Sequence, residues 1–187
     1  MDELVKKAIS EKSYSYKEYR ELTDKLLTEG KTTGPDQSPQ MIEYTKLNVV
    51  RMSRIDKTTG INEQVFNSVS TIENNQIWLV ISEPWCGDAA NIVPVLSSIA
   101  EINDRINFRI ILRDDNPEIM DRYLTNGGRA IPMLVIFDED SGKELAFWGP
   151  RPATLQNIIN KMKSMPDFSI DELKKTIQLW YAENKTK

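Results

Sequence analysis

The sequence contains no histidine and one cysteine, Cys86, among its 187 residues. Without histidine, the chain cannot build a Ser–His or Cys–His catalytic pair, or a zinc site with imidazole ligands. A single thiol excludes an internal disulfide and a multi-thiolate metal site, so we expect no resident metal or other cofactor. Scarce cysteine also favours a reducing, cytoplasmic setting.

Charge and hydropathy argue against two further classes of partner. The net charge is -4 and no run of Lys and Arg stands out, which disfavours general nucleic-acid binding. No segment approaches the roughly 20 apolar residues that cross a bilayer. The first residues also lack the apolar stretch of a signal peptide. We therefore expect a protein that works away from membranes and nucleic acids.

The first third of the sequence predicts helices. Residues 15–29 begin with a capping box formed by Ser15 and Glu18, and apolar residues then recur at helical spacing. Residues 31–40 read as a linker, because they are rich in Thr, Gly, Pro and Ser. Residues 40–56 predict a second helix whose broad apolar face should pack against the rest of the chain rather than hang free.

The remainder of the sequence predicts an α/β domain. We assign residues 1–60 to an N-terminal helical extension packed on the core, and residues 61–187 to this domain, including a C-terminal helix. Its expected helices are 62–72, 86–103, 117–125, one that begins near Pro152 and one capped by Ser169, and its expected strands are 77–82, 107–113, 133–137 and 143–148. A strand, a crossover helix and a second strand give a right-handed parallel pair, to which a final hairpin adds two strands. This order predicts a four-stranded mixed sheet with helices on both faces.

One segment resembles a known active site. The residues Trp-Cys-Gly-Asp-Ala at 85–89 resemble the Trp-Cys-Gly-Pro-Cys motif of the thioredoxin family, at the same place between a buried strand and a helix. Pro94 lies eight residues beyond Cys86, where thioredoxins have the proline that kinks this helix. Ile131-Pro132, before the third strand, and Gly149, after the hairpin, also match. The resemblance covers roughly residues 62–165 and implies a thioredoxin-like, three-layer α/β/α fold.

The resemblance also implies roles for particular residues. Cys86 corresponds to the nucleophilic cysteine, and the substrate-binding residues would be Trp85, Gly87, Asp88, Ile131 and Pro132, with Pro132 in the cis form and facing the cysteine. The chain departs from the family pattern in three places: Ala89 replaces the second cysteine, Asp88 replaces the middle proline, and Val80 stands where many thioredoxins bury an acid.

The chemistry of Cys86 can also be argued without the family. Unpaired N–H groups and the macrodipole at a helix N-terminus favour the thiolate, which is the nucleophilic form. The Asp88 carboxylate in the same turn disfavours it, and the sequence leaves that balance open. The simpler alternatives are that Cys86 is a small buried apolar residue and that Pro132 merely starts a strand.

The sequence leaves three functions open. The first is a monothiol thiol–disulfide oxidoreductase, in which Cys86 forms a mixed disulfide with a protein or peptide and an outside thiol, such as a low-molecular-weight thiol, releases it. The second is a redox-inactive binding module that recognises an extended peptide or a protein partner. The third is a peroxide-sensing thiol that passes through sulfenic acid, which the missing histidine and missing resolving cysteine disfavour.

Overall fold

The computed structural model describes residues 1–184. Within that range the helices are α1 (Glu3–Lys12), α2 (Tyr16–Thr28), α3 (Pro39–Thr58), α4 (Glu63–Ser70), α5 (Gly87–Ala100), α6 (Pro117–Met120), α7 (Ala153–Lys163) and α8 (Ile170–Asn184). The strands are β1 (Gln76–Ser82), β2 (Ile106–Leu112), β3 (Met133–Asp138) and β4 (Glu144–Trp148). No helix in this part of the chain is long and apolar enough to cross a bilayer.

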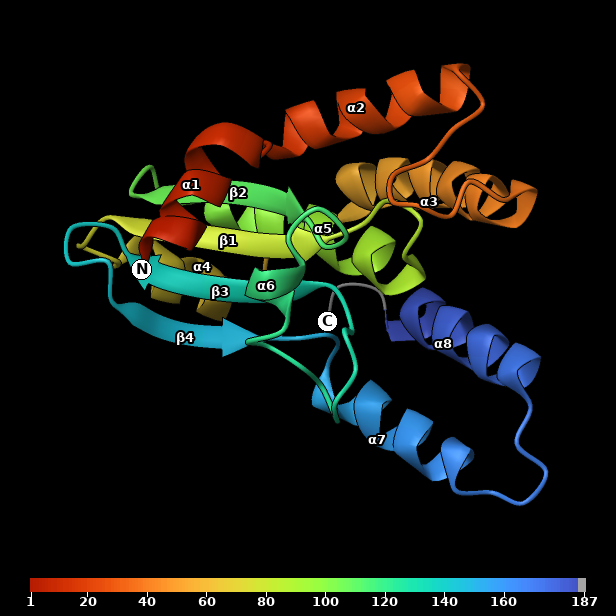
Figure 1. Ribbon diagram of the computed structural model, residues 1–187. Helices are drawn as coiled ribbons and strands as arrows, with labels where there is room; N and C mark the ends of the chain where they lie inside the picture. The colour runs from red at the N-terminus through yellow and green to blue at the C-terminus, as the bar shows by residue number, and fades with distance from the viewer. Residues whose placement is uncertain (185–187) are drawn as a thin grey trace.

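The strands form one mixed sheet in the order β2–β1–β3–β4. β1 and β2 are parallel, as expected for two strands joined by a crossover helix. β3 runs antiparallel to β1, and β4 runs antiparallel to β3. The predicted α/β fold, with a four-stranded mixed sheet between layers of helices, is confirmed (Figure 1).

Successive residues of β1 point to opposite faces of the sheet and enter two separate cores. Ile77, Leu79 and Ile81 pack in a cluster to which α1 and α6 contribute. Trp78 and Val80 pack in a second cluster, formed with α2, α3, α4 and α5. β1 is therefore covered on both faces, which explains its nearly continuous apolar sequence.

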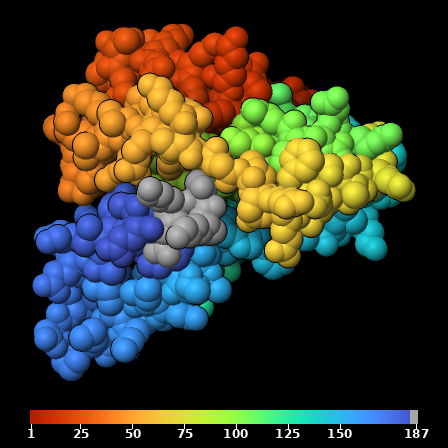
Figure 2. Space-filling view, turned by 180° about the vertical axis from the view of Figure 1, so that it is seen from behind, coloured from red at the N-terminus to blue at the C-terminus, as the bar shows by residue number. Residues whose placement is uncertain are grey.

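The N-terminal helices are part of the packed structure. The capping box predicted at Ser15 and Glu18 is present at the start of α2. Met52 of α3 and Tyr19 of α2 are each only 1% exposed and share a cluster with Val93 of α5. On its other side α5 packs with α7 and α8 through a third cluster. α3 (orange) and α8 (blue) consequently meet on one side of the molecule (Figure 2).

Two helices differ from the sequence-based expectation. α1 was not predicted, because only a few apolar side chains mark it, yet Val5 and Ala8 are buried against the sheet and Asp2 caps the helix. α6 ends at Met120 instead of continuing to residue 125. Beyond it the chain makes turns, and Asn126 and Gly127, both with positive φ, form a tight turn further along the loop.

Candidate functional site

Cys86 lies between the end of β1 and the start of α5. It is the N-cap residue of α5, with extended backbone geometry and no side-chain cap hydrogen bond. Its side chain is half-buried, and Sγ donates a hydrogen bond to the backbone carbonyl of Ile131 at 3.4 Å. The pairing of β1 with β3 causes this contact, because Ile81 and Met133 are cross-strand partners and the residues beyond each strand end therefore converge.

The segment that faces the sulfur is held by the end of the hairpin. The Ile131–Pro132 peptide bond is cis, and both residues are buried. Gly149, just after β4, has φ 141°, and a Cβ there would overlap the carbonyl oxygen of Pro132. Only glycine allows this close approach. The structure therefore brings Cys86, Ile131, Pro132 and Gly149 together, although the sequence separates them widely.

Asp88 is buried in the first turn of α5, and its carboxylate is fully engaged. Arg151, from the loop before α7, donates to it through Nε at 3.1 Å and forms an ion pair with it. The Tyr181 hydroxyl of α8 donates to its other oxygen at 2.9 Å. Asp88 thus joins the start of α5 to the C-terminal helices, and both of its oxygens point toward these partners.

Burial and nearby groups shift the pKa of the Cys86 thiol in opposite directions. Burial, followed by the Asp88 carboxylate, raises the pKa of the Cys86 thiol to about 12. The backbone N–H groups of Ala89 and Asp88, and the Arg151 guanidinium, act in the opposite direction but do not prevail. At neutral pH the sulfur is consequently held as the thiol, whose reactivity is low compared with that of a thiolate.

A buried acid lies three residues before the cysteine, and sequence reasoning missed it. Glu83 is 0% exposed, accepts hydrogen bonds from the Thr33 hydroxyl and, at 2.9 Å, from the Asp114 N–H. Burial is the main reason why the pKa of Glu83 rises to about 7. Its position directly after a buried strand and before Pro84 was the signal that could have identified it.

Trp85 is half-buried and has neighbours from two other parts of the chain. The guanidinium carbon of Arg113 lies 4.6 Å from the centre of its ring, a cation–π arrangement. Gly34, in the loop between α2 and α3, lies near its indole nitrogen, which a Cβ at this glycine would meet at 3.6 Å. The N-terminal extension therefore contributes to the surroundings of the cysteine as well as to the core.

A cavity of about 340 Å³ opens over the cysteine between α3 and α8. Trp85, Cys86 and Gly87 line it, so it brings together three of the predicted site residues. Asp88, Ile131 and Pro132 do not line it. Its walls are residues that the sequence gave no reason to single out: Met41, Tyr44, Leu47, Asn48 and Arg51 from α3, and Lys174 and Gln178 from α8.

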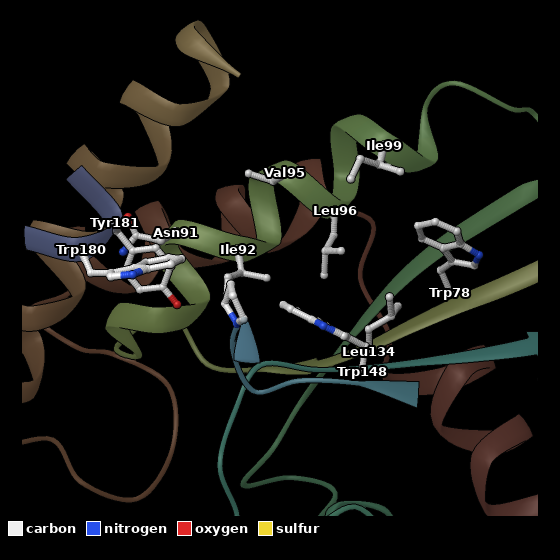
Figure 3. Close-up of a pocket in the computed structure, with 11 residues that line it drawn as sticks. Trp78, Asn91, Ile92, Val95, Leu96, Ile99, Leu134, Trp148, Trp180 and Tyr181 are labelled. Carbon is white, nitrogen blue, oxygen red and sulfur yellow. The ribbon is translucent and has the colours of Figure 1, made fainter. Parts of the chain in front are cut away.

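A second cavity, of about 320 Å³, lies on a different side of α5 (Figure 3). Its walls are almost entirely apolar, and three tryptophans line it: Trp78 of β1, Trp148 of β4 and Trp180 of α8. Cys86 is not among its lining residues. Trp148 is 39% exposed, because β4 is an edge strand. In residues 1–184, no cluster of Asp, Glu and Cys is suited to hold a metal ion.

Comparison with known proteins identifies the family. A family model described as thioredoxin matches residues 34–163. Thioredoxin from Porphyra purpurea is 33% identical over 91 residues, which cover 47% of this chain and 82% of that protein. Thioredoxin 1 from Synechococcus elongatus is 30% identical over 79 residues, covering 42% and 71% respectively.

The solved structures agree with this at the level of the fold. A Pseudomonas aeruginosa protein of unknown function superposes with a TM-score of 0.53 at 18% identity, over 77% of this chain and 81% of its own. That similarity shows the fold alone. Together with the Cys86 site at the start of α5 and the family match over residues 34–163, these comparisons show that the chain belongs to the thioredoxin family.

Proposed function

We propose that this protein is a monothiol member of its family that exchanges disulfides through Cys86 and depends on an outside thiol for release. The observation that carries the proposal is the placement of a half-buried Cys86 at the start of α5, where it lines a cavity. Trp85, Gly87, Ile131 and Pro132 would contact the partner. Asp88 would act on the thiol through its charge, since its oxygens bind Arg151 and Tyr181.

The disulfide exchange conserves atoms and electrons without a cofactor. The Cys86 sulfur attacks one sulfur of a partner disulfide, the S–S bond breaks, and the second partner sulfur leaves as a thiol with the proton that Cys86 gives up. Cys86 is then joined to the first partner sulfur. Ala89 supplies no thiol to break this bond from within. An outside thiol must therefore attack the mixed disulfide.

The raised pKa of Cys86 determines which products accumulate. At neutral pH little thiolate is available, so the first attack is slow. The same high pKa makes Cys86 a poor leaving group, because thiols of lower pKa leave faster. An outside thiol will therefore displace the partner more readily than it displaces Cys86. We infer a protein that captures partners slowly, releases them readily to an outside thiol, and then stays joined to that thiol until a second one arrives, in a reducing compartment, the cytoplasm.

The decisive experiment measures adduct formation on native protein. Incubation with glutathione disulfide, followed by intact-mass spectrometry, should show one added glutathione on the native chain and none on the Cys86→Ser variant. The adduct should form slowly at pH 7 and faster as the pH rises toward 10. If denatured protein forms the adduct and native protein forms none, Cys86 is shielded and the exchange mechanism fails.

The high pKa also favours a second candidate, a binding module without redox turnover. In that case the partner would be recognised by the surface around Trp85 and Ile131, and Cys86 would be inert. A disulfide reduction assay with insulin, driven only by a thioredoxin-reductase system, separates the two. Both functions predict little activity for the native chain. Only the exchange mechanism predicts a gain for Ala89→Cys, and Ala89→Ser controls for the added volume at this buried position.

A further inference from the structure

We propose that the cavity between α3 and α8 binds a low-molecular-weight thiol that carries carboxylate groups, and that this ligand is the outside thiol. The inference rests on the proposed function of Cys86 and names its partner class. With a volume of about 340 Å³, the cavity falls at the lower end of the roughly 300–1,000 Å³ range of small-molecule sites. That size suits a ligand comparable to a very short peptide.

Two cations at the edge of a mostly apolar cavity point to a ligand with an apolar skeleton and anionic groups. Arg51 of α3 and Lys174 of α8 line it from opposite walls, whereas no Asp or Glu lines it. Neither cation lies within ion-pair distance of a carboxylate among residues 1–184, although Asp171 of α8 acts on Lys174 at longer range. A ligand with carboxylates would supply the missing partners, and Arg can bind a carboxylate through two parallel hydrogen bonds.

Both cations are held in place by neutral neighbours. Arg51 donates to the side-chain oxygen of Asn48 at 2.7 Å, and Asn48 in turn donates to the Pro84 carbonyl at 2.8 Å, in the loop that leads to Cys86. Lys174 donates to the Tyr44 hydroxyl at 3.0 Å and lies 5.4 Å from the centre of that ring. These neutral contacts hold the Arg51 guanidinium and the exposed Lys174 ammonium at the cavity.

Cys86 itself lines the cavity, so a ligand bound there would lie beside the nucleophile. Gly87 follows the cysteine, and a Cβ there would meet the Gln178 amide nitrogen at 2.9 Å and approach an Arg51 nitrogen at 3.7 Å. Arg51 and Gln178 thus both stand beside the residue next to the nucleophile. The side chains of Met41, Leu47 and Trp85 provide apolar surface for the ligand's carbon skeleton.

The ligand would complete the exchange in two steps. A bound ligand thiol attacks the Cys86 sulfur of the mixed disulfide, the partner leaves as a thiol, and Cys86 becomes joined to the ligand. A second ligand thiol then attacks the ligand sulfur, Cys86 leaves as a thiol, and the ligand departs as its own disulfide. Two ligand thiols are oxidised for each partner disulfide reduced. The second step is the slower one, because Cys86 is the poorer leaving group.

Binding can be tested without any thiol chemistry. The Cys86→Ser variant is titrated with S-methylglutathione, a thioether with two carboxylates that cannot exchange, and binding is followed calorimetrically. Adding Arg51→Gln or Lys174→Gln to this background should weaken binding by about tenfold each, as expected for loss of a charge-assisted contact. The matched controls Arg54→Gln on α3 and Lys175→Gln on α8 are exposed, do not line the cavity, and should change binding less than twofold.

A second measurement separates this inference from the exchange mechanism itself. The chain with Cys86 intact is reacted with glutathione disulfide and, separately, with the uncharged hydroxyethyl disulfide. The carboxylated probe should react about tenfold faster, and Arg51→Gln should reduce that preference. Equal rates for both probes, or no detectable binding of S-methylglutathione, would overturn the anionic ligand while leaving exchange at Cys86 intact. Failure of both probes to react would overturn the exchange.

Discussion

Replacing Glu83 by glutamine should remove a pH dependence of stability that this one side chain creates. Glu83 is fully buried at the end of β1, and its pKa rises from an ordinary value of 4.5 to about 7, mainly because of burial. Below pH 4.5 the carboxyl is protonated in both the folded and the unfolded chain. Between pH 4.5 and pH 7 only the folded chain retains the proton, so the free energy of unfolding falls as the pH rises.

The size of the effect follows from the pKa values. At about 1.4 kcal/mol for each pKa unit, a rise from 4.5 to about 7 corresponds to roughly 3 kcal/mol of stability present in acid and lost by pH 8. Glutamine cannot ionise, and its amide can mimic the protonated acid: its oxygen can accept from the Asp114 N–H, and its nitrogen can donate to the Thr33 hydroxyl. The Glu83→Gln variant should therefore gain about 3 kcal/mol relative to the native chain between pH 4 and pH 8.

The assay is urea unfolding followed by circular dichroism at pH 4, 5, 6, 7 and 8. The quantity of interest is the difference in unfolding free energy between variant and native chain, because other titrating groups cancel in it. Glu139→Gln makes the same change on the exposed hairpin turn and should run parallel to the native chain. If Glu83→Gln also runs parallel to the native chain from pH 4 to pH 8, the buried carboxyl is not the titrating group and the reasoning fails.

Three further changes test the surroundings of Cys86. Asp88→Asn removes the charge that raises the pKa of Cys86, so the rate of alkylation by iodoacetamide at pH 8 should rise roughly tenfold; an unchanged rate would show that burial alone controls the thiol. Arg151→Gln leaves the buried Asp88 carboxylate without its cation and should lower the unfolding free energy by about 3 kcal/mol in urea titrations, whereas Arg129→Gln, on an exposed ion pair, should cost under ~1 kcal/mol. Deleting residues 1–57 uncovers the face of α5 that packs on α3, and should lower the thermal midpoint or cause aggregation; an unchanged midpoint would show that the extension is an independent arm.

Local sequence signals predicted the architecture well where they were strong. The capping box at Ser15, the apolar run of β1 and the prolines at 94 and 132 each act over a few residues, so a single stretch of sequence reveals them. The sequence did not predict α1, because this helix has few apolar residues and is stabilised by tertiary contacts of Val5 and Ala8 with the sheet. Such stabilisation cannot be seen in a local pattern.

Some residues of the site could likewise be found from local sequence, and others could not. Cys86 and its neighbours Trp85 and Gly87 could be found because they form one continuous motif, and Ile131 because it precedes a recognisable strand. Arg51 and Lys174 could not be found from sequence, since each is an ordinary exposed-looking cation on an amphipathic helix. Both line the cavity that Cys86 also lines only because α3 and α8 each pack on α5, and no short stretch of sequence encodes that packing.

The two departures from the family motif act in the same direction, and this agreement bears on mechanism. Ala89 removes the internal thiol that would break a mixed disulfide, and Asp88 raises the pKa of Cys86, which makes that sulfur harder to displace. Either change alone would slow a two-cysteine cycle. Together they leave the release of a captured partner to an outside thiol and slow the later step, in which Cys86 itself is the leaving group. Arg151 and Tyr181 hold the buried Asp88 carboxylate beside the thiol, so the arrangement that makes Cys86 a poor leaving group is built into the packing of the C-terminal helices.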